Sequence, residues 1–240
     1  MTIIIKSFSA VADLIPDSSK VSFGQLKQYL RELIEVELPD ETEKKIAREV
    51  MVLVGAHTNY FEAPASARFH LNEPQGLLRH SLGVTYRLLA LMSAYNITDK
   101  YNKLDVILAG LLHDLGKASQ VWLSPLESDK ATKIGNETYA IDSSDYYIKE
   151  YLKTRPAEYK YSINHELTAM SVPMRSLYFI STVLSDLWKP TPDAYQAVMF
   201  HDSMYVPEGK YVAHSDCKLT VCLANSDYFQ SRCESGWKNV

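Results

Sequence analysis

Apolar residues recur every three or four positions over most of this chain, and this spacing predicts a helical protein. Prolines and a glycine interrupt the pattern over residues 60–76, where we expect a loop. Residues 118–145 are polar and irregular, with a small hairpin expected at Ile134–Tyr139. We therefore expect an all-α fold with functional loops between its helices. The predicted helices cover approximately residues 23–30, 39–57, 77–95, 103–112, 145–153, 165–187, 192–202 and 217–233.

With 240 residues, the chain is long enough for one large domain, or for one domain with an extension. We expect a helical N-terminal extension over residues 1–60 and a main domain over residues 61–240. Hydrophobic residues make up 46% of the chain, which is enough for a sizeable core. The formal net charge of −4 gives no general attraction to nucleic acid or to anionic membranes, although it allows a local basic groove.

The three cysteines, Cys217, Cys222 and Cys233, are odd in number and lack CxxC spacing. This usage is typical of a reduced cytoplasmic chain rather than of a disulfide framework. The first apolar run is too short for a signal peptide. No stretch approaches the roughly 18 uninterrupted apolar residues of a transmembrane helix. We therefore expect a cytoplasmic protein that does not enter the membrane.

The most informative motif is His113-Asp114, which follows the apolar run 106–112. An imidazole and a carboxylate at the end of a buried helix are costly to bury without partners. A bound divalent cation would make both groups favourable, so the pair indicates a metal site. Further candidate ligands stand on or beside other predicted helices: His80, His165, His201 and Asp227.

Two alternatives remain open among these ligands. Asp216 is the rival of Asp227, although it stands at a helix start where it would serve as a cap. Asp202 could take part in place of His201. Imidazole and carboxylate ligands suit Mn, Fe, Ni, Co or Zn better than Ca. The remaining histidines, His57, His70 and His214, are expected to be ordinary.

Two segments resemble motifs of the HD-domain metal-dependent phosphohydrolases. Residues 76–81 (GLLRHS) are similar to the opening GLL-x-H-[ST], and residues 109–117 (AGLLHDLGK) are similar to AGLLHDIGK. The resemblance covers approximately residues 70–235 and implies the helical bundle of that family. It also implies four metal ligands, which are His80, His113, Asp114 and Asp227.

Some branches of this family add two histidines that hold a second metal ion, and His165 and His201 stand where these are expected. The resemblance to this branch implies two divalent ions (Mn, Fe, Ni, Co, Zn or Mg) with Asp114 as the bridge. The simple nucleotidase branch needs only four ligands. As alternatives, His165 could be a capping or surface histidine, and His201 could be an ordinary one.

The resemblance implies a phosphohydrolase in which a metal-activated hydroxide attacks phosphorus. Asp114 and Lys117 would then be catalytic, and Lys117 and Arg79 could bind phosphoryl oxygens. The implied substrate is a cyclic or linear nucleotide, or a short single-stranded nucleic acid cleaved by a phosphodiesterase or 3′-5′ exonuclease.

Other functions remain open for the same fold. One is a nucleoside mono- or triphosphate phosphohydrolase, and others are a di-iron oxygenase and a non-catalytic nucleotide sensor. Cyclic di-GMP hydrolysis is not favoured, because residues 201–207 (HDSMYVP) lack the Gly-Tyr-Pro signature of that branch. Tyr159-Lys160-Tyr161 could stack on bases or simply pack. The sequence also allows a homo-oligomer.

Overall fold

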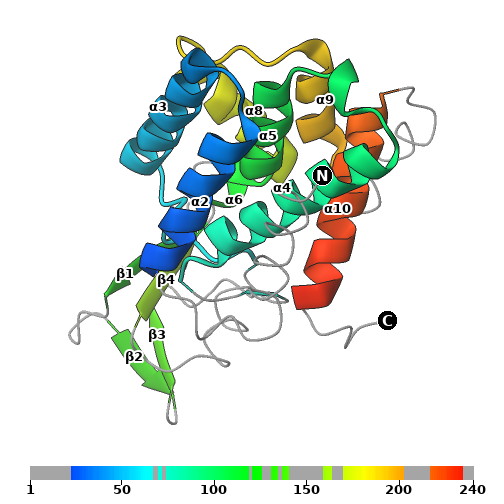
Figure 1. Ribbon diagram of the computed structural model, residues 1–240. Helices are drawn as coiled ribbons and strands as arrows, with labels where there is room; N and C mark the ends of the chain where they lie inside the picture. Colours follow the sequence, from blue (N-terminus) through cyan, green and yellow to red (C-terminus); the bar gives the residue numbers. More distant parts are fainter. Residues whose placement is uncertain are drawn as a thin grey trace.

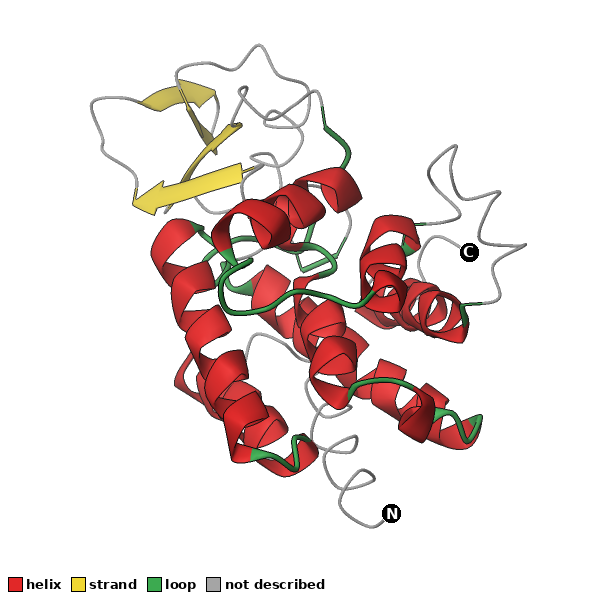
Figure 2. Ribbon diagram, turned by 90° about the horizontal axis from the view of Figure 1, so that it is seen from above, coloured by secondary structure: helices red, strands yellow, loops and turns green. Residues whose placement is uncertain are grey.

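The computed structural model describes residues 23–66, 70–71, 74–118, 121–125, 131–134, 137–140, 159–163, 170–202 and 217–234. The described part is a helical bundle, as expected (Figures 1 and 2). Its helices are α2 (Phe23–Glu37), α3 (Glu41–His57), α4 (Gly76–Ala94), the 3₁₀ helix η2 (Thr98–Lys100), α5 (Lys103–Leu112), α6 (Leu115–Ala118), α8 (Val172–Val183), α9 (Pro192–Phe200) and α10 (Lys218–Glu234).

Helices α4 and α5 form the centre of the bundle. Fourteen of the 19 residues of α4 and nine of the 10 residues of α5 are buried, so both helices are covered on nearly all sides. α10 packs along α4, and α9 packs against α5 and α10 (Figure 1). His80 on α4 and His113 at the end of α5 are therefore withdrawn from water.

Helices α2 and α3 cover one side of the centre and present a single apolar stripe each. In α2, Leu26, Leu30 and Leu33 recur at helical spacing and are buried. α3 begins at the N-cap Asp40, whose carboxylate accepts hydrogen bonds from the backbone N–H groups of Thr42 and Glu43. Both helices share one hydrophobic core with the later helices. The expected division of the chain at residue 60 stays a prediction.

Four short strands form two antiparallel pairs at one side of the bundle (Figure 2). β2 (Ala131–Ile134) pairs with β3 (Glu137–Ala140), which confirms the hairpin expected there. β1 (Val121–Pro125) pairs with β4 (Tyr159–Ile163), and neither strand was predicted from the sequence. The two strands are far apart in the chain, so no local pattern in the sequence indicates that they pair.

The helix expected over residues 165–187 is wrong at both ends within the described residues. α8 begins at Val172, because the Ser171 hydroxyl caps it by accepting from the Met174 N–H, and Pro173 follows in the first turn. It ends at Val183, after which the chain turns and Trp188 donates from Nε1 to Asp105 on α5 (2.7 Å). The helix expected at 145–153 lies outside the described residues.

α8 fixes the turn that carries the His-Asp motif. The Ser176 hydroxyl donates to the His113 carbonyl oxygen (2.7 Å) and accepts from the Gly116 N–H (2.8 Å). Arg175 Nε donates to the Gly116 carbonyl oxygen at 3.0 Å. A Cβ atom at Gly116 would lie 2.8 Å from Arg175 Cβ, so only glycine allows this close approach of α6 to α8.

No helix among the described residues is both long enough and apolar enough to cross a bilayer.

Candidate metal centre

Four of the predicted ligands meet inside the bundle. His80 comes from α4, His113 and Asp114 from the turn after α5, and Asp227 from α10. One ligand atom from each lies within 4.8 Å of all the others. His80 Nε2 is 3.0 Å from Asp227 Oδ1 and 3.5 Å from Asp114 Oδ2, and His113 Nε2 is 3.4 Å from Asp114 Oδ2. Buried His and Asp side chains thus form a group that could hold a metal ion.

Two histidines occupy the same position at the ends of two helices. His113 is the C-cap residue of α5, and its Nδ1 lies 2.7 Å from the Gly110 carbonyl oxygen. His201 is the C-cap residue of α9, and its Nδ1 lies 2.7 Å from the Val198 carbonyl oxygen. A carbonyl oxygen only accepts, so both rings carry a proton on Nδ1 and direct Nε2 inward. Such backbone hydrogen bonds are typical of metal-binding histidines.

The two oxygens of Asp114 face different groups. Oδ2 faces His80 and His113, whereas Oδ1 lies 3.4 Å from Nε2 of His201. A carboxylate in this position can contact two ions, one through each oxygen. His201 also belongs to a second possible ligand group with Asp202 and Asp227, so both His201 and Asp202 lie at the centre.

The buried polar atoms of the centre provide a test of whether a cation fits. Within the described residues, His113 Nε2, His201 Nε2 and Asp114 Oδ1 are buried and have no hydrogen-bond partner. Leaving such atoms without a partner costs about 1–3 kcal/mol each. With Nε2 of each ring deprotonated, all three atoms offer lone pairs suited to a divalent cation, and each Nε2 lies 3.4 Å from an oxygen of Asp114. The donor set therefore fits a metal ion.

The protonation of the histidines also indicates that a divalent cation fits this centre. Burial alone would lower the pKa of His80, but the carboxylates of Glu234 and Asp227 outweigh it and raise this pKa to about 10. Burial also opposes the protonation of His201, but Asp114 and Asp202 raise its pKa to about 9. Both rings are thus protonated at neutral pH in the metal-free protein. One divalent cation in place of these two protons would leave the total charge unchanged.

The acidic ligands remain ionised despite their burial. Burial by itself would raise the pKa of Asp114, but the Lys117 ammonium and the neighbouring imidazoles hold it well below the usual range. Burial would likewise raise the pKa of Asp227, but the neighbouring imidazoles of His113 and His80 outweigh it and hold this pKa well below the usual range. Two charged carboxylates are therefore available to a cation near neutral pH.

Lys117 is the cationic side chain of the centre. Its Nζ forms an ion pair with Asp114 Oδ2, and about a quarter of its side chain (24%) is accessible to solvent. Burial would lower its pKa, but Asp114, Asp227 and Asp202 together raise it, so the ammonium stays charged. Lys117 follows the His113-Asp114 pair by three residues in the sequence, and in the structure its ammonium contacts the carboxylate of Asp114.

Glu234 is a residue of the centre that sequence reasoning missed. Its side chain is 2% exposed, and its Oε2 lies 2.8 Å from His80 Nδ1. His70, which was expected to be ordinary, lies beside both, with Nε2 3.8 Å from Glu234 Oε2. Glu234 follows Asp227 by seven positions on α10, so the two share one face of the helix. That spacing was the signal that could have identified it.

The other predicted site residues are distributed as follows. Arg79 is buried (6% exposed) on α4, next to His80, and its role in substrate binding stays a prediction. His57 is exposed at the end of α3. His165, Asp216 and His214 lie outside the described residues, so the choice of Asp227 over Asp216 rests on the observed position of Asp227 alone.

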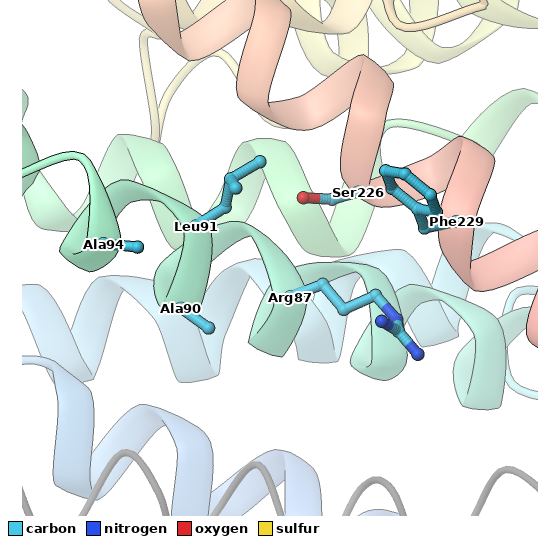
Figure 3. A pocket seen from close by; sticks show the side chains of 6 residues that line it. All are labelled: Arg87, Ala90, Leu91, Ala94, Ser226 and Phe229. Carbon is cyan, nitrogen blue, oxygen red and sulfur yellow. The ribbon is translucent and has the colours of Figure 1, made fainter.

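An apolar hollow of about 270 Å³ lies between α4 and α10 (Figure 3). None of the residues that line it is a predicted ligand, so it is separate from the metal centre. The lining residues are Arg87, Ala90, Leu91, Ala94, Ser226 and Phe229.

Comparison of the chain with protein families, curated proteins and solved structures found no match.

Proposed function

We propose that this protein is a divalent-metal-dependent phosphohydrolase of the HD-domain type. The observation that carries the proposal is the meeting of His80, His113, Asp114 and Asp227 at one buried point, where His113 Nε2 and Asp114 Oδ1 lack a hydrogen-bond partner. These are the four residues that the resemblance to the HD-domain family implies. The order of the ligands along the chain and their positions on helices agree with that resemblance.

The residues of the chain have distinct parts in this proposal. A bound divalent cation would supply Lewis acidity and lower the pKa of a coordinated water. His113 and His201 hold their Nδ1 protons on backbone carbonyls, which keeps each Nε2 directed inward. Lys117 places an ammonium beside Asp114, where it can bind an oxygen of a phosphoryl group.

We further propose two ions rather than one. Asp114 directs Oδ1 towards His201 and Oδ2 towards His80 and His113, which suits a bridging carboxylate. His201, Asp202 and Asp227 offer a second group of ligand atoms within reach of one another. His165 would complete this second group by resemblance to the dinuclear branch of the family.

The proposed substrate is a nucleotide or a short single-stranded nucleic acid. This choice rests on the resemblance, since a metal centre and an ammonium recognise a phosphoryl group whatever is attached to it. A nucleoside mono- or triphosphate is the alternative substrate for the same chemistry.

The test combines metal content with product analysis. Wild type, Asp114→Ala, His201→Ala and the exposed control Asp186→Ala are loaded with Mn²⁺ and assayed on nucleoside mono- and triphosphates, cyclic dinucleotides and short single strands. We expect two Mn²⁺ per chain in wild type, one in His201→Ala, and phosphate-ester cleavage that Asp114→Ala abolishes. Asp186→Ala should behave as wild type.

Other results would contradict the proposal in different ways. Cleavage that survives in Asp114→Ala would show that the centre is not the active site. Equal metal content in His201→Ala and wild type would rule out the second ion at this position. Tightly bound iron after aerobic purification, without turnover of any phosphate ester, would favour oxygen chemistry instead.

A further inference from the structure

We infer that Glu234 is a positioning residue of the metal centre, which acts through His80; this inference rests on the proposed metal site. Glu234 Oε2 lies 2.8 Å from Nδ1 of His80, and the opposite ring nitrogen, Nε2, faces Asp227 and Asp114. With Glu234 accepting the Nδ1 proton, Nε2 is the nitrogen left to bind a metal. A carboxylate, a histidine and a metal in this sequence form a triad that orients the ring and makes it a stronger ligand.

Glu234 is itself held in place by a defined hydrogen bond. Gln230, one helical turn earlier on α10, donates from Nε2 to Glu234 Oε1 at 2.7 Å. The carboxylate therefore uses one oxygen for Gln230 and the other for His80. Its side chain is nearly inaccessible to solvent (2% exposed), so water does not compete for these oxygens. The hydrogen bond to His80 then becomes stronger than an exposed one.

The link continues to the neighbouring helix. Gln230 Oε1 accepts from Arg87 Nε on α4 at 2.6 Å, so the amide connects a guanidinium on one side to a carboxylate on the other. A side-chain amide accepts at its oxygen and donates from its nitrogen, so one residue makes both contacts. Gly83 makes room for it, because a Cβ atom at this position of α4 would lie 2.5 Å from Gln230 Cδ. The network thus fixes α10, with Asp227, against α4, with His80.

Glu234, His70 and His80 also offer ligand atoms within 4.8 Å of one another, but the role inferred for Glu234 differs from that of a direct ligand. Its contact with His80 is through Nδ1, on the far side of the ring from the carboxylates of Asp114 and Asp227. Loss of Glu234 should therefore weaken metal binding without removing a binding site. Loss of a ligand would instead remove a metal ion or abolish binding.

The test measures metal binding and does not depend on turnover. Full-length Glu234→Ala, Glu234→Gln and the exposed control Glu49→Ala are titrated with Mn²⁺ by calorimetry. We expect Glu234→Ala to bind Mn²⁺ about 10–100-fold more weakly than wild type, with the same number of ions per chain. Glu234→Gln should lose less, because its amide oxygen still accepts from Nδ1 but carries no charge. Glu49→Ala should match wild type.

A spectroscopic measurement separates positioning from general stabilisation. Long-range ¹H–¹⁵N spectra of the Zn²⁺-loaded protein report which nitrogen of His80 carries the proton. We expect a proton on Nδ1 of wild type, and a faster exchange of that proton with solvent in Glu234→Ala. If Glu234→Ala does not fold, Glu234→Gln and Gln230→Leu serve the same purpose, with a smaller loss of affinity expected for both.

Two results would overturn the inference. Loss of one full equivalent of metal in a folded Glu234 variant would make Glu234 a ligand. Unchanged affinity and unchanged proton exchange would show that it only supports the packing of α10. Wild-type protein that binds Mn²⁺ but cleaves no phosphate ester would contradict the proposed hydrolase function. The titrations would still decide whether Glu234 positions His80.

Discussion

Asp114 is the side chain on which the centre depends most directly. It is 1% exposed, forms an ion pair with Lys117, and faces three imidazoles from three parts of the chain. A buried carboxylate of this kind is tolerated only when cations surround it. In the metal-free protein these cations are Lys117 and protonated histidines, and the proposed metal ion would take over part of that role.

The proposed role of Lys117 can be distinguished from that of a metal ligand by measuring both kcat/KM and the affinity for Mn²⁺. We expect Lys117→Met to lower kcat/KM about 10–100-fold, because an ammonium that hydrogen-bonds a charged oxygen contributes about 1.5–3 kcal/mol. The affinity of Lys117→Met for Mn²⁺ should stay the same or rise, since the substitution removes a positive charge beside the proposed metal position. Turnover assays and calorimetric titrations measure the two quantities.

The control for this substitution is Lys45→Met. Lys45 is exposed on α3, and its Nζ lies 3.9 Å from Glu49 Oε1. Neither kcat/KM nor the affinity for Mn²⁺ should therefore change in Lys45→Met. A weaker affinity of Lys117→Met for Mn²⁺ would contradict the role given to Lys117, because it would show that the ammonium supports the ligands rather than the substrate.

At the scale of elements, the centre lies where helix ends meet. His113 and His201 are the C-cap residues of α5 and α9, and the C-terminal end of a helix carries a partial negative charge. Two such ends therefore favour a cation between them. Asp105 on α5 also accepts from Thr191, the N-cap residue of α9, which fixes α9 against α5. The packing of short helices thus sets the distances between ligands.

The contact between α6 and α8 gives a prediction at this scale. Gly116→Ala should lower the free energy of unfolding by about 1–3 kcal/mol, because its Cβ would overlap the backbone and side chain of α8. It should also weaken Mn²⁺ binding, since α8 holds the turn that carries His113. Thermal unfolding and metal titration measure these effects.

Gly55→Ala is a matched control for the same substitution. Gly55 is an exposed residue of α3, and the atoms nearest to an added Cβ would be those of the Phe61 ring, at 2.7 Å, and not backbone. Gly55→Ala should lose less stability than Gly116→Ala, because a side chain shifts more easily than backbone and because alanine favours the helix over glycine. A Gly116→Ala variant as stable as this control would show that α6 and α8 can move apart without cost.

At the scale of the whole molecule, the bundle buries several ionised groups at one point of its core. Metal binding should therefore stabilise the folded state, because the unfolded chain does not bring the ligands together. At a Mn²⁺ concentration of about 100 times the dissociation constant, the gain is about 2.7 kcal/mol. For a chain of this size, that gain corresponds to a rise of about 5–10 °C in Tm.

This prediction is checked by thermal unfolding with added Mn²⁺ and with a chelator. Asp114→Ala should show the same Tm under both conditions, because it lacks the carboxylate that would contact both proposed ions. Ca²⁺ at the same concentration should raise Tm less, since it prefers oxygen ligands to imidazoles. Equal Tm values for wild type with Mn²⁺ and with chelator would contradict a metal centre in the core.

Most helices and the His113-Asp114 pair could be predicted from the sequence because their signals are local. Apolar spacing gave α3, α4, α5, α9 and α10 to within one or two residues at most ends. His113 and Asp114 were recognisable because polar groups that follow a buried run need partners. The pairing of β1 with β4 was missed because the two strands are far apart in the chain. The start of α8 was missed because it depends on the Ser171 cap and on the proline that follows it.

The four candidate ligands that meet in the core, and the helices that carry or precede them, could thus be identified from the sequence. Only the tertiary structure decided which side chains surround those ligands: Glu234 behind His80, Lys117 on Asp114, and His201 opposite the second oxygen of Asp114. The contacts of Glu234 with His80 and of His201 with Asp114 join residues far apart in the chain through the packing of α4, α5, α9 and α10. Spacing along a sequence fixes the face of a helix, but the distance between two faces is set by how the helices pack.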